Sequence, residues 1–111
     1  MKKYTIIISK DAKKDISEIY NYIAENDIVG KAKILLAELK KILNRLSFLP
    51  HRGHNVHELN SRKLLEIYYK PYRIIYSITD NAVIIIGVLD GRRDLKKLLL
   101  KRFADIKMEI F

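Results

Sequence analysis

Residues 63–89 read KLLEIYYKPYRIIYSITDNAVIIIGVL, and this stretch decides the fold. Its isoleucine, tyrosine and valine residues fall into three runs, at 63–69, 72–79 and 82–89. Branched and aromatic side chains of this kind favour strands. The runs are separated by the pairs Lys70-Pro71 and Asp80-Asn81, which are typical of turns. Because each gap is about two residues long, we predict an antiparallel meander of three strands.

Two amphipathic segments precede the meander. From Asp11 to about residue 26, apolar side chains recur at the three- and four-residue steps of one helical face, and residues 29–48 show the same period. Ser9 or Asp11 is placed to cap the first helix. Only a very short link separates the two segments, so we expect an antiparallel helix hairpin.

Weaker signals complete the chain. Residues 4–9 contain three consecutive isoleucines and predict a short first strand. Pro50 and Gly53 predict a loop after the second helix. Residues 94 to about 107 are amphipathic and predict a final helix, which folds either by itself or only on a partner. The expected order is βααβββ(α), an α+β fold whose helix hairpin packs on one face of a small antiparallel sheet, in one domain spanning residues 1–111.

Side-chain alternation gives the predicted sheet two faces, and both are apolar. The face expected to pack on the helix hairpin carries Leu65, Ile67, Ile74, Tyr76, Ile78, Val83, Ile85 and Leu89. The opposite face carries Leu64, Glu66, Tyr68, Arg73, Ile75, Ser77, Ile84, Ile86 and Val88. Because this second face is too apolar to lie in water, we expect the C-terminal segment, a second copy or a partner chain to cover it.

The two turns also predict where three arginines lie. A meander centred on these turns places Arg73 opposite both Tyr68 and Val88. Arg92 and Arg93 follow the last strand by a few residues and would reach the same edge of the sheet. The sequence therefore predicts that the three arginines converge beside the second apolar face.

The composition indicates a basic protein of the cytoplasm. Lys and Arg number 22 against 13 Asp and Glu, a net charge of +9, which favours nucleic acid, an acidic protein or an anionic membrane surface as partner. The absence of cysteine excludes disulfides and thiol chemistry. The apolar run after Met1-Lys2-Lys3 is too short for a signal peptide, and the longest apolar run, at 82–89, is far shorter than a membrane span. We therefore expect a cytoplasmic protein without membrane contact.

Five features of the chain resemble the RelE/ParE superfamily of toxins. Besides the element order, they are the loop Leu49-Pro50-His51-Arg52-Gly53, the segment Val56-His57-Glu58-Leu59, the strand Tyr72-Arg73-Ile74-Ile75-Tyr76 and the ending Val88-Leu89-Asp90-Gly91-Arg92-Arg93-Asp94. The resemblance covers essentially the whole chain. The Pro-x-x-Gly loop and the Gly-Arg-Arg-Asp ending look more like the ParE, or plasmid-stabilisation, branch.

The resemblance implies the toxin component of a type II toxin–antitoxin system. Its partner would be a cognate antitoxin, small, acidic and partly disordered, which wraps the toxin and folds as it binds. The ParE branch implies inhibition of DNA gyrase through protein contact, and the assembly would be a homodimer or a toxin–antitoxin heterotetramer. Two alternatives stay open: a RelE-like mRNA interferase that acts on mRNA at the ribosome, and a basic adaptor domain without toxicity.

The match to the RelE branch is incomplete. Arg73 matches one family arginine, and Arg93, or Arg92, matches a second. Two family lysines fall at Leu64 and Glu66 here, and the family's C-terminal tyrosine falls at about Leu99. The resemblance therefore retains a cation clamp for phosphate but loses the proton-transfer set.

The gyrase-inhibitor and interferase hypotheses each predict a set of site residues. The residues expected to contact the target or the antitoxin are Arg52, Tyr68, Arg73, Arg92, Arg93, Lys96 and Lys97. In an interferase, the catalytic residues would be Arg73, Arg93 and His54. The competing interpretation is structural: Arg73 pairs with Glu66 or Asp90, Tyr68 packs at the rim of the sheet, and the other cations are solvated.

Three histidines lie three residues apart, at His51, His54 and His57. On a helix they would share one face and suggest a metal or general-base cluster. Pro50 and Gly53 oppose a helix at this place. We therefore expect solvated loop histidines, with no metal and no cofactor.

Overall fold

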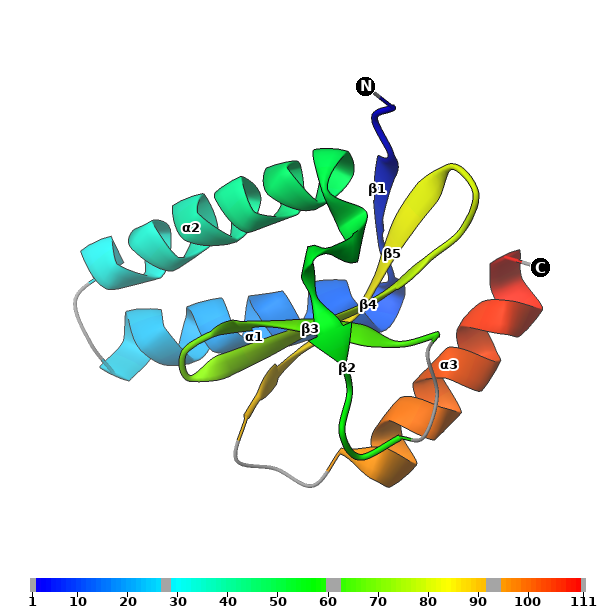
Figure 1. Ribbon diagram of the computed structural model, residues 1–111. Coiled ribbons are helices and arrows are strands. Elements are labelled where there is room, and N and C mark those ends of the chain that lie inside the picture. Colours follow the sequence, from blue (N-terminus) through cyan, green and yellow to red (C-terminus); the bar gives the residue numbers. More distant parts are fainter. Residues whose placement is uncertain (1, 27–28, 60–62, 92–94, 111) are drawn as a thin grey trace.

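In the computed structural model, a five-stranded sheet lies between two helices on one side and one helix on the other (Figure 1). The structure describes residues 2–26, 29–59, 63–91 and 95–110. The elements are β1 (Thr5–Ile8), α1 (Lys10–Asn26), α2 (Val29–Phe48), the 3-10 turn η1 (Pro50–Arg52), β2 (His54–Asn55), β3 (Leu65–Tyr69), β4 (Tyr72–Ile78), β5 (Ala82–Asp90) and α3 (Lys96–Ile110). The predicted order is confirmed, and β2 is an added strand too short to show a period.

The sheet is mixed rather than entirely antiparallel. Its strand order is β1-β5-β4-β3-β2, and β3, β4 and β5 form the predicted antiparallel meander. β1 runs parallel to β5, with Thr5 opposite Ala82 and Ile8 opposite Ile85. The reason lies in the connection: α1 and α2 carry the chain away from β1 across one face of the sheet, and parallel neighbours require a crossover of this kind.

The register of Arg73 differs from the prediction on one of its two sides. Arg73 pairs with Tyr68, as predicted, but with Leu89 instead of Val88. The cause is a β-bulge farther along the β4–β5 pair, where the register shifts by one residue. A turn-centred count assumes an uninterrupted ladder and cannot include this extra residue.

The bulge exchanges the faces of two side chains. Val88 joins the core under the helix hairpin and Leu89 joins the core under α3, the reverse of the prediction. A Cβ atom on Gly87 would lie 3.0 Å from Nη1 of Arg102. The glycine in the bulged strand therefore leaves room for the arginine that approaches from α3.

The helix hairpin begins with the predicted serine cap. The Ser9 Oγ accepts a hydrogen bond from the Ala12 amide at 3.1 Å, which satisfies one of the free amides at the start of α1. The core between the hairpin and the sheet contains the buried residues Ala12, Leu35, Leu39, Leu46, Ile74, Tyr76, Val83, Ile85 and Val88. None of the helices in the described part of the chain has the length and apolar character needed to cross a bilayer.

The second face of the sheet is covered by α3. A separate core contains Val56, Leu59, Leu64, Ile75, Ile84, Ile86, Leu89, Leu95 and Leu99. Leu95 and Leu99 are fully buried in it. The sequence predicted that the C-terminal segment, a second copy or a partner chain would cover this face. The C-terminal segment covers it, so the chain buries this face by itself.

An ion pair joins the helices on the two faces of the sheet. Arg102 of α3 donates to both carboxylate oxygens of Asp15 of α1, at 2.6 and 3.0 Å, and to the Ile86 carbonyl at 3.3 Å. Asp15 also accepts a hydrogen bond from the Val88 amide at 3.1 Å. Because β1 pairs with β5 only as far as Ile85, these two side chains satisfy the β5 edge where β1 has ended. Hydrogen bonding to Asp15 raises the pKa of Arg102, which stays charged.

Candidate functional site

Arg73 lies in the central strand and is buried, with 1% of its surface exposed. Its Nε and Nη2 donate to Oε2 of Glu66, at 2.8 and 2.5 Å. Its Nη1 and Nη2 donate to the two carboxylate oxygens of Glu58, at 2.5 and 2.6 Å. Glu66 is one of the two carboxylates that the sequence suggested as a partner of Arg73. Glu58 is a further partner, which the sequence did not suggest.

The sheet and one loop bring these three charges together. Glu66 pairs with Ile75 across β3 and β4, and Arg73 lies two residues from Ile75 on the same face, so the two side chains are diagonal neighbours. Glu58 comes from the loop between β2 and β3. Val56 and Leu59, on either side of it, are buried in the core under α3 and hold the loop in place.

The cluster leaves Arg73 with little charge to offer to another molecule. The hydrogen bonds from Arg73 lower the pKa of Glu58 from 4.5 to about 2 and outweigh burial, which alone would raise it. The hydrogen bonds that Arg73 donates to Glu58, and then those to Glu66, raise the pKa of Arg73. Two carboxylates against one guanidinium give a net charge of about −1, so the cluster does not offer a phosphate a net positive charge.

Two histidines and a tyrosine form the exposed rim of this cluster. The His54 Nε2 lies 3.4 Å from Oε1 of Glu66, and the His57 Nδ1 lies 3.3 Å from Oε1 of Glu58. The His54 ring stacks on Tyr68 with 5.4 Å between centroids. Desolvation, followed by the charge of Glu66, raises the pKa of Tyr68, which keeps this half-exposed phenol neutral.

One buried acceptor in the cluster is not satisfied. Oε1 of Glu66 is buried and has no hydrogen bond to any described residue, and the nearest histidine nitrogen, Nε2 of His54, lies 3.4 Å away. A protonated His54 would pair with it electrostatically. In the described ranges, no three His, Asp or Glu side chains gather as a metal site would require.

The Pro-x-x-Gly loop is explained by a buried tyrosine. The Tyr76 hydroxyl donates to the Pro50 carbonyl at 2.7 Å and accepts from the Gly53 amide at 3.0 Å. A Cβ on Gly53 would lie 2.4 Å from this hydroxyl and 2.7 Å from the Glu66 carbonyl. Glycine is therefore required at this position by close packing, and the loop delivers His54 to β2 directly after it.

The other predicted contact residues are exposed on η1 and α3 or fall outside the described part of the chain. Arg52 is exposed on η1, and Lys96 and Lys97 are exposed on α3. Arg92 and Arg93 fall outside the described residues, so their predicted convergence with Arg73 stays a prediction. The chain does leave β5 beside Arg73, since a Cβ on the preceding glycine would lie 3.3 Å from the Arg73 Cγ.

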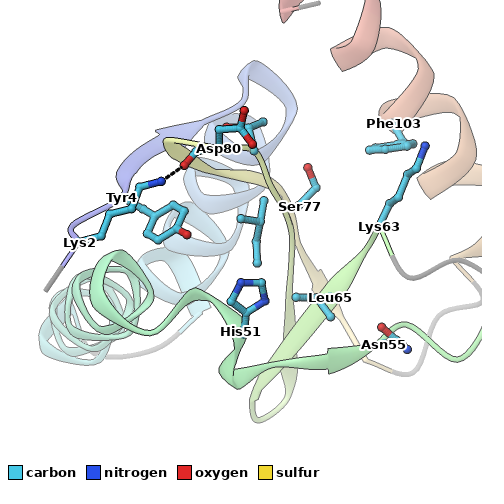
Figure 2. Close-up of a pocket in the computed structure, with 11 residues that line it drawn as sticks. Lys2, Tyr4, His51, Asn55, Lys63, Leu65, Ser77, Asp80 and Phe103 are labelled. Atoms are coloured by element: carbon cyan, nitrogen blue, oxygen red, sulfur yellow. Dashed lines mark hydrogen bonds between the residues drawn. The ribbon is translucent and has the colours of Figure 1, made fainter.

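His51 belongs to a different feature, a pocket of about 860 Å³ at the end of the sheet where β4 ends (Figure 2). The pocket is lined by residues of the N-terminus, η1, β2, the start of β3, the end of β4 and α3. Sequence reasoning did not identify it, because its walls come from segments far apart in the chain.

The chain is similar to known toxins. A family model described as the ParE toxin of the type II toxin–antitoxin system parDE matches residues 6–95. Toxin ParE3 of Caulobacter vibrioides is 27% identical over 97 residues, which cover 87% of this chain and 96% of that protein. A solved structure, the chromosomal ParDE toxin–antitoxin system from P. aeruginosa, has the same fold, with a TM-score of 0.67, 11% identity and coverage of 78% of this chain and 95% of that one.

Proposed function

Since the chain belongs to the ParE toxin family of type II toxin–antitoxin systems, whose members have an antitoxin partner, we propose that it arrests growth by binding DNA gyrase and that its antitoxin neutralises it. The toxin acts through protein contact and breaks no bond itself. The family match supports the toxin and its partner, and the arrangement around Arg73 supports contact over RNA cleavage.

The burial of Arg73 is the observation that favours protein contact over RNA cleavage. RNA cleavage by attack of the 2′-hydroxyl requires a cation next to the charge that develops on the phosphate. A guanidinium that is 1% exposed and bonded to two carboxylates cannot reach a phosphate unless the cluster opens. Binding to a protein target through surface side chains needs no such rearrangement.

The test is to express the chain alone and to determine which process stops first. We expect DNA synthesis to stop before protein synthesis, with messenger RNA intact, and the purified chain to inhibit supercoiling by purified gyrase or to trap cleaved DNA. If the neighbouring reading frame encodes a short acidic protein, its co-expression should restore growth. Breaks in ribosome-bound mRNA together with unaffected supercoiling would refute the gyrase target.

A second candidate, mRNA cleavage of the RelE kind, is favoured by one observation at the rim of the cluster. The exposed imidazole of His54 is backed by the buried carboxylate of Glu66 and stacks on the ring of Tyr68. A histidine placed in this way resembles a general base, and an aromatic ring beside it could stack on a nucleobase.

Substitution of His54 separates the two candidates. In an interferase, His54→Ala would abolish the mapped mRNA breaks, whereas a gyrase inhibitor would keep its toxicity. His51→Ala, at another exposed loop histidine, is the matched control. A chain that leaves growth unaffected in a susceptible host would indicate a non-toxic adaptor domain instead.

A further inference from the structure

The pocket at the end of the sheet has a lining of mixed polar and apolar residues, with lysines at two of its sides. Leu65, Ile78, Tyr4 and Phe103 supply apolar surface, and Figure 2 shows Lys2 and Lys63 at well-separated positions around the hollow. The volume of about 860 Å³ is enough for several side chains of a bound polypeptide. None of the described residues that line this pocket belongs to the cluster around Arg73.

The positive charge at the pocket is held in place by the chain itself. The Lys2 ammonium donates to the Asp80 carbonyl and lies 4.7 Å from the centroid of the Tyr4 ring. An ammonium has three donors, so Lys2 keeps donors for an incoming carboxylate. Lys63 adds a second charge, and Asp80 is the one acidic residue among the described residues that line the pocket.

The same combination of lysine and apolar surface continues onto the end of α2. The Tyr4 amide donates to the Ser47 carbonyl at 2.7 Å, which brings the N-terminus against this helix end. Phe48 and Leu49, the next two residues, are exposed by 39% and 56%, and the Lys3 ammonium lies 5.6 Å from the centroid of the Phe48 ring. Exposed apolar side chains with charges beside them are typical of a surface for a protein partner.

We propose that this surface, the pocket together with the exposed end of α2, binds an acidic, amphipathic segment of the antitoxin. The proposal rests on the proposed function, because it takes the antitoxin as the partner. Carboxylates of the segment pair with Lys2, Lys3 and Lys63, while its apolar side chains enter the pocket.

The chemistry of the surface favours this occupant over two others. A second copy of the chain would bring another net charge of +9 to a surface that is already positive. Nucleic acid binds through a row of cations along its phosphates, whereas here two or three lysines surround aliphatic and aromatic surface. An acidic polypeptide with apolar side chains matches both properties.

The test takes as its probe the purified antitoxin, identified as the short acidic protein whose co-expression restores growth, and measures its binding to the full chain and to matched variants. The double variant Lys2→Glu and Lys63→Glu should bind roughly tenfold more weakly, mainly through a slower association rate. Asn55→Trp, at an exposed position of the pocket wall, should also weaken binding by filling the pocket. The control Lys14→Glu and Lys33→Glu makes the same charge change at exposed positions of α1 and α2 and should bind like the unaltered chain.

The outcomes separate this inference from the proposed function. If the unaltered chain binds the antitoxin and both pocket variants bind equally well, the docking surface is wrong and the toxin–antitoxin function stands. If the unaltered chain does not bind, neutralisation by this antitoxin fails and the docking surface fails with it. If the Lys2→Glu and Lys63→Glu variant loses binding only to a single-stranded oligonucleotide, the surface belongs to nucleic acid and the proposal is overturned. Unchanged urea midpoints for all variants show that a loss of binding is not a loss of folding.

Discussion

Arg73 is buried together with Glu58 and Glu66, and its main effect in this conformation is structural. The arginine connects the loop before β3 to the strands β3 and β4. A buried ion pair adds little compared with well-packed apolar residues, but loss of one partner leaves the other charge uncompensated. Any substitution of Arg73 therefore changes folding before it reports on activity.

The first prediction concerns the removal of this guanidinium. Arg73→Ala should lower the free energy of unfolding by about 3–5 kcal/mol, because it leaves two carboxylates close together in a buried place. Unfolding in urea at neutral pH measures the loss. Lys97→Ala, at an exposed position of α3, should change the free energy by no more than about 0.5 kcal/mol. A loss for Arg73→Ala no larger than that of the control would show that the cluster is not a stabilising unit.

The second prediction is a pH dependence of stability from Glu58. Its pKa is about 2 in the folded chain and about 4.5 without its partners, so between these values the unfolded chain binds more protons. The stabilisation is therefore complete above about pH 4.5 and is lost as the pH falls through about 2. Glu58→Gln should remove this part of the pH dependence, and urea midpoints of both chains between about pH 5 and pH 2.5 measure it. Parallel curves for the two chains would contradict the assignment to Glu58.

At the scale of elements, the helices and the meander follow from local patterns. The period of α1 and α2, the serine cap and the two-residue turns each depend on residues close together in the chain, so the sequence shows them directly. The β-bulge could not be predicted in this way. The shift lies between Ile75 and Tyr76, inside a run of apolar residues without a turn signal, and the nearby contact of Gly87 with Arg102 of α3 joins residues 15 positions apart.

The contents of the site depend in the same way on distant contacts. Arg73 and Glu66 are diagonal neighbours in one hairpin, and their pairing could be suggested from the sequence. Glu58 could not be assigned as the second partner, because its position is set by Val56 and Leu59 packing under α3. The cover of the second face stayed open because an amphipathic helix fits its own sheet, another copy or a partner equally well.

The third prediction tests α3 as an integral part of the fold. Leu99 is fully buried under the sheet, whereas its neighbour Leu100 is 52% exposed. Leu99→Ala should cost about 2–5 kcal/mol of unfolding free energy through lost burial and a cavity, and Leu100→Ala should cost much less. Urea unfolding of the two variants gives the comparison. Equal, small losses would mean that α3 does not pack on the sheet in solution.

At the scale of the whole molecule, charge is distributed in two different ways. In the described part of the chain, the buried Arg73 and the partly buried Arg102 are paired with Glu58, Glu66 and Asp15. The net charge of +9 is therefore carried mainly by exposed lysines, which are spread over the helices and the N-terminus. Such a surface attracts acidic partners but also repels itself in the folded state.

The last prediction follows from the difference between the paired arginines inside the fold and the exposed lysines on its surface. Added sodium chloride screens repulsion between exposed charges far more than it screens the buried pairs, so it should raise the midpoint of urea unfolding at neutral pH. A variant with Lys14→Glu, Lys33→Glu and Lys97→Glu carries less repulsion and should show a smaller rise. A midpoint that falls as salt is added would mean that exposed attractive pairs outweigh the repulsion. In that case attractive pairs within the folded chain would already offset the repulsion between its positive charges, without an acidic partner.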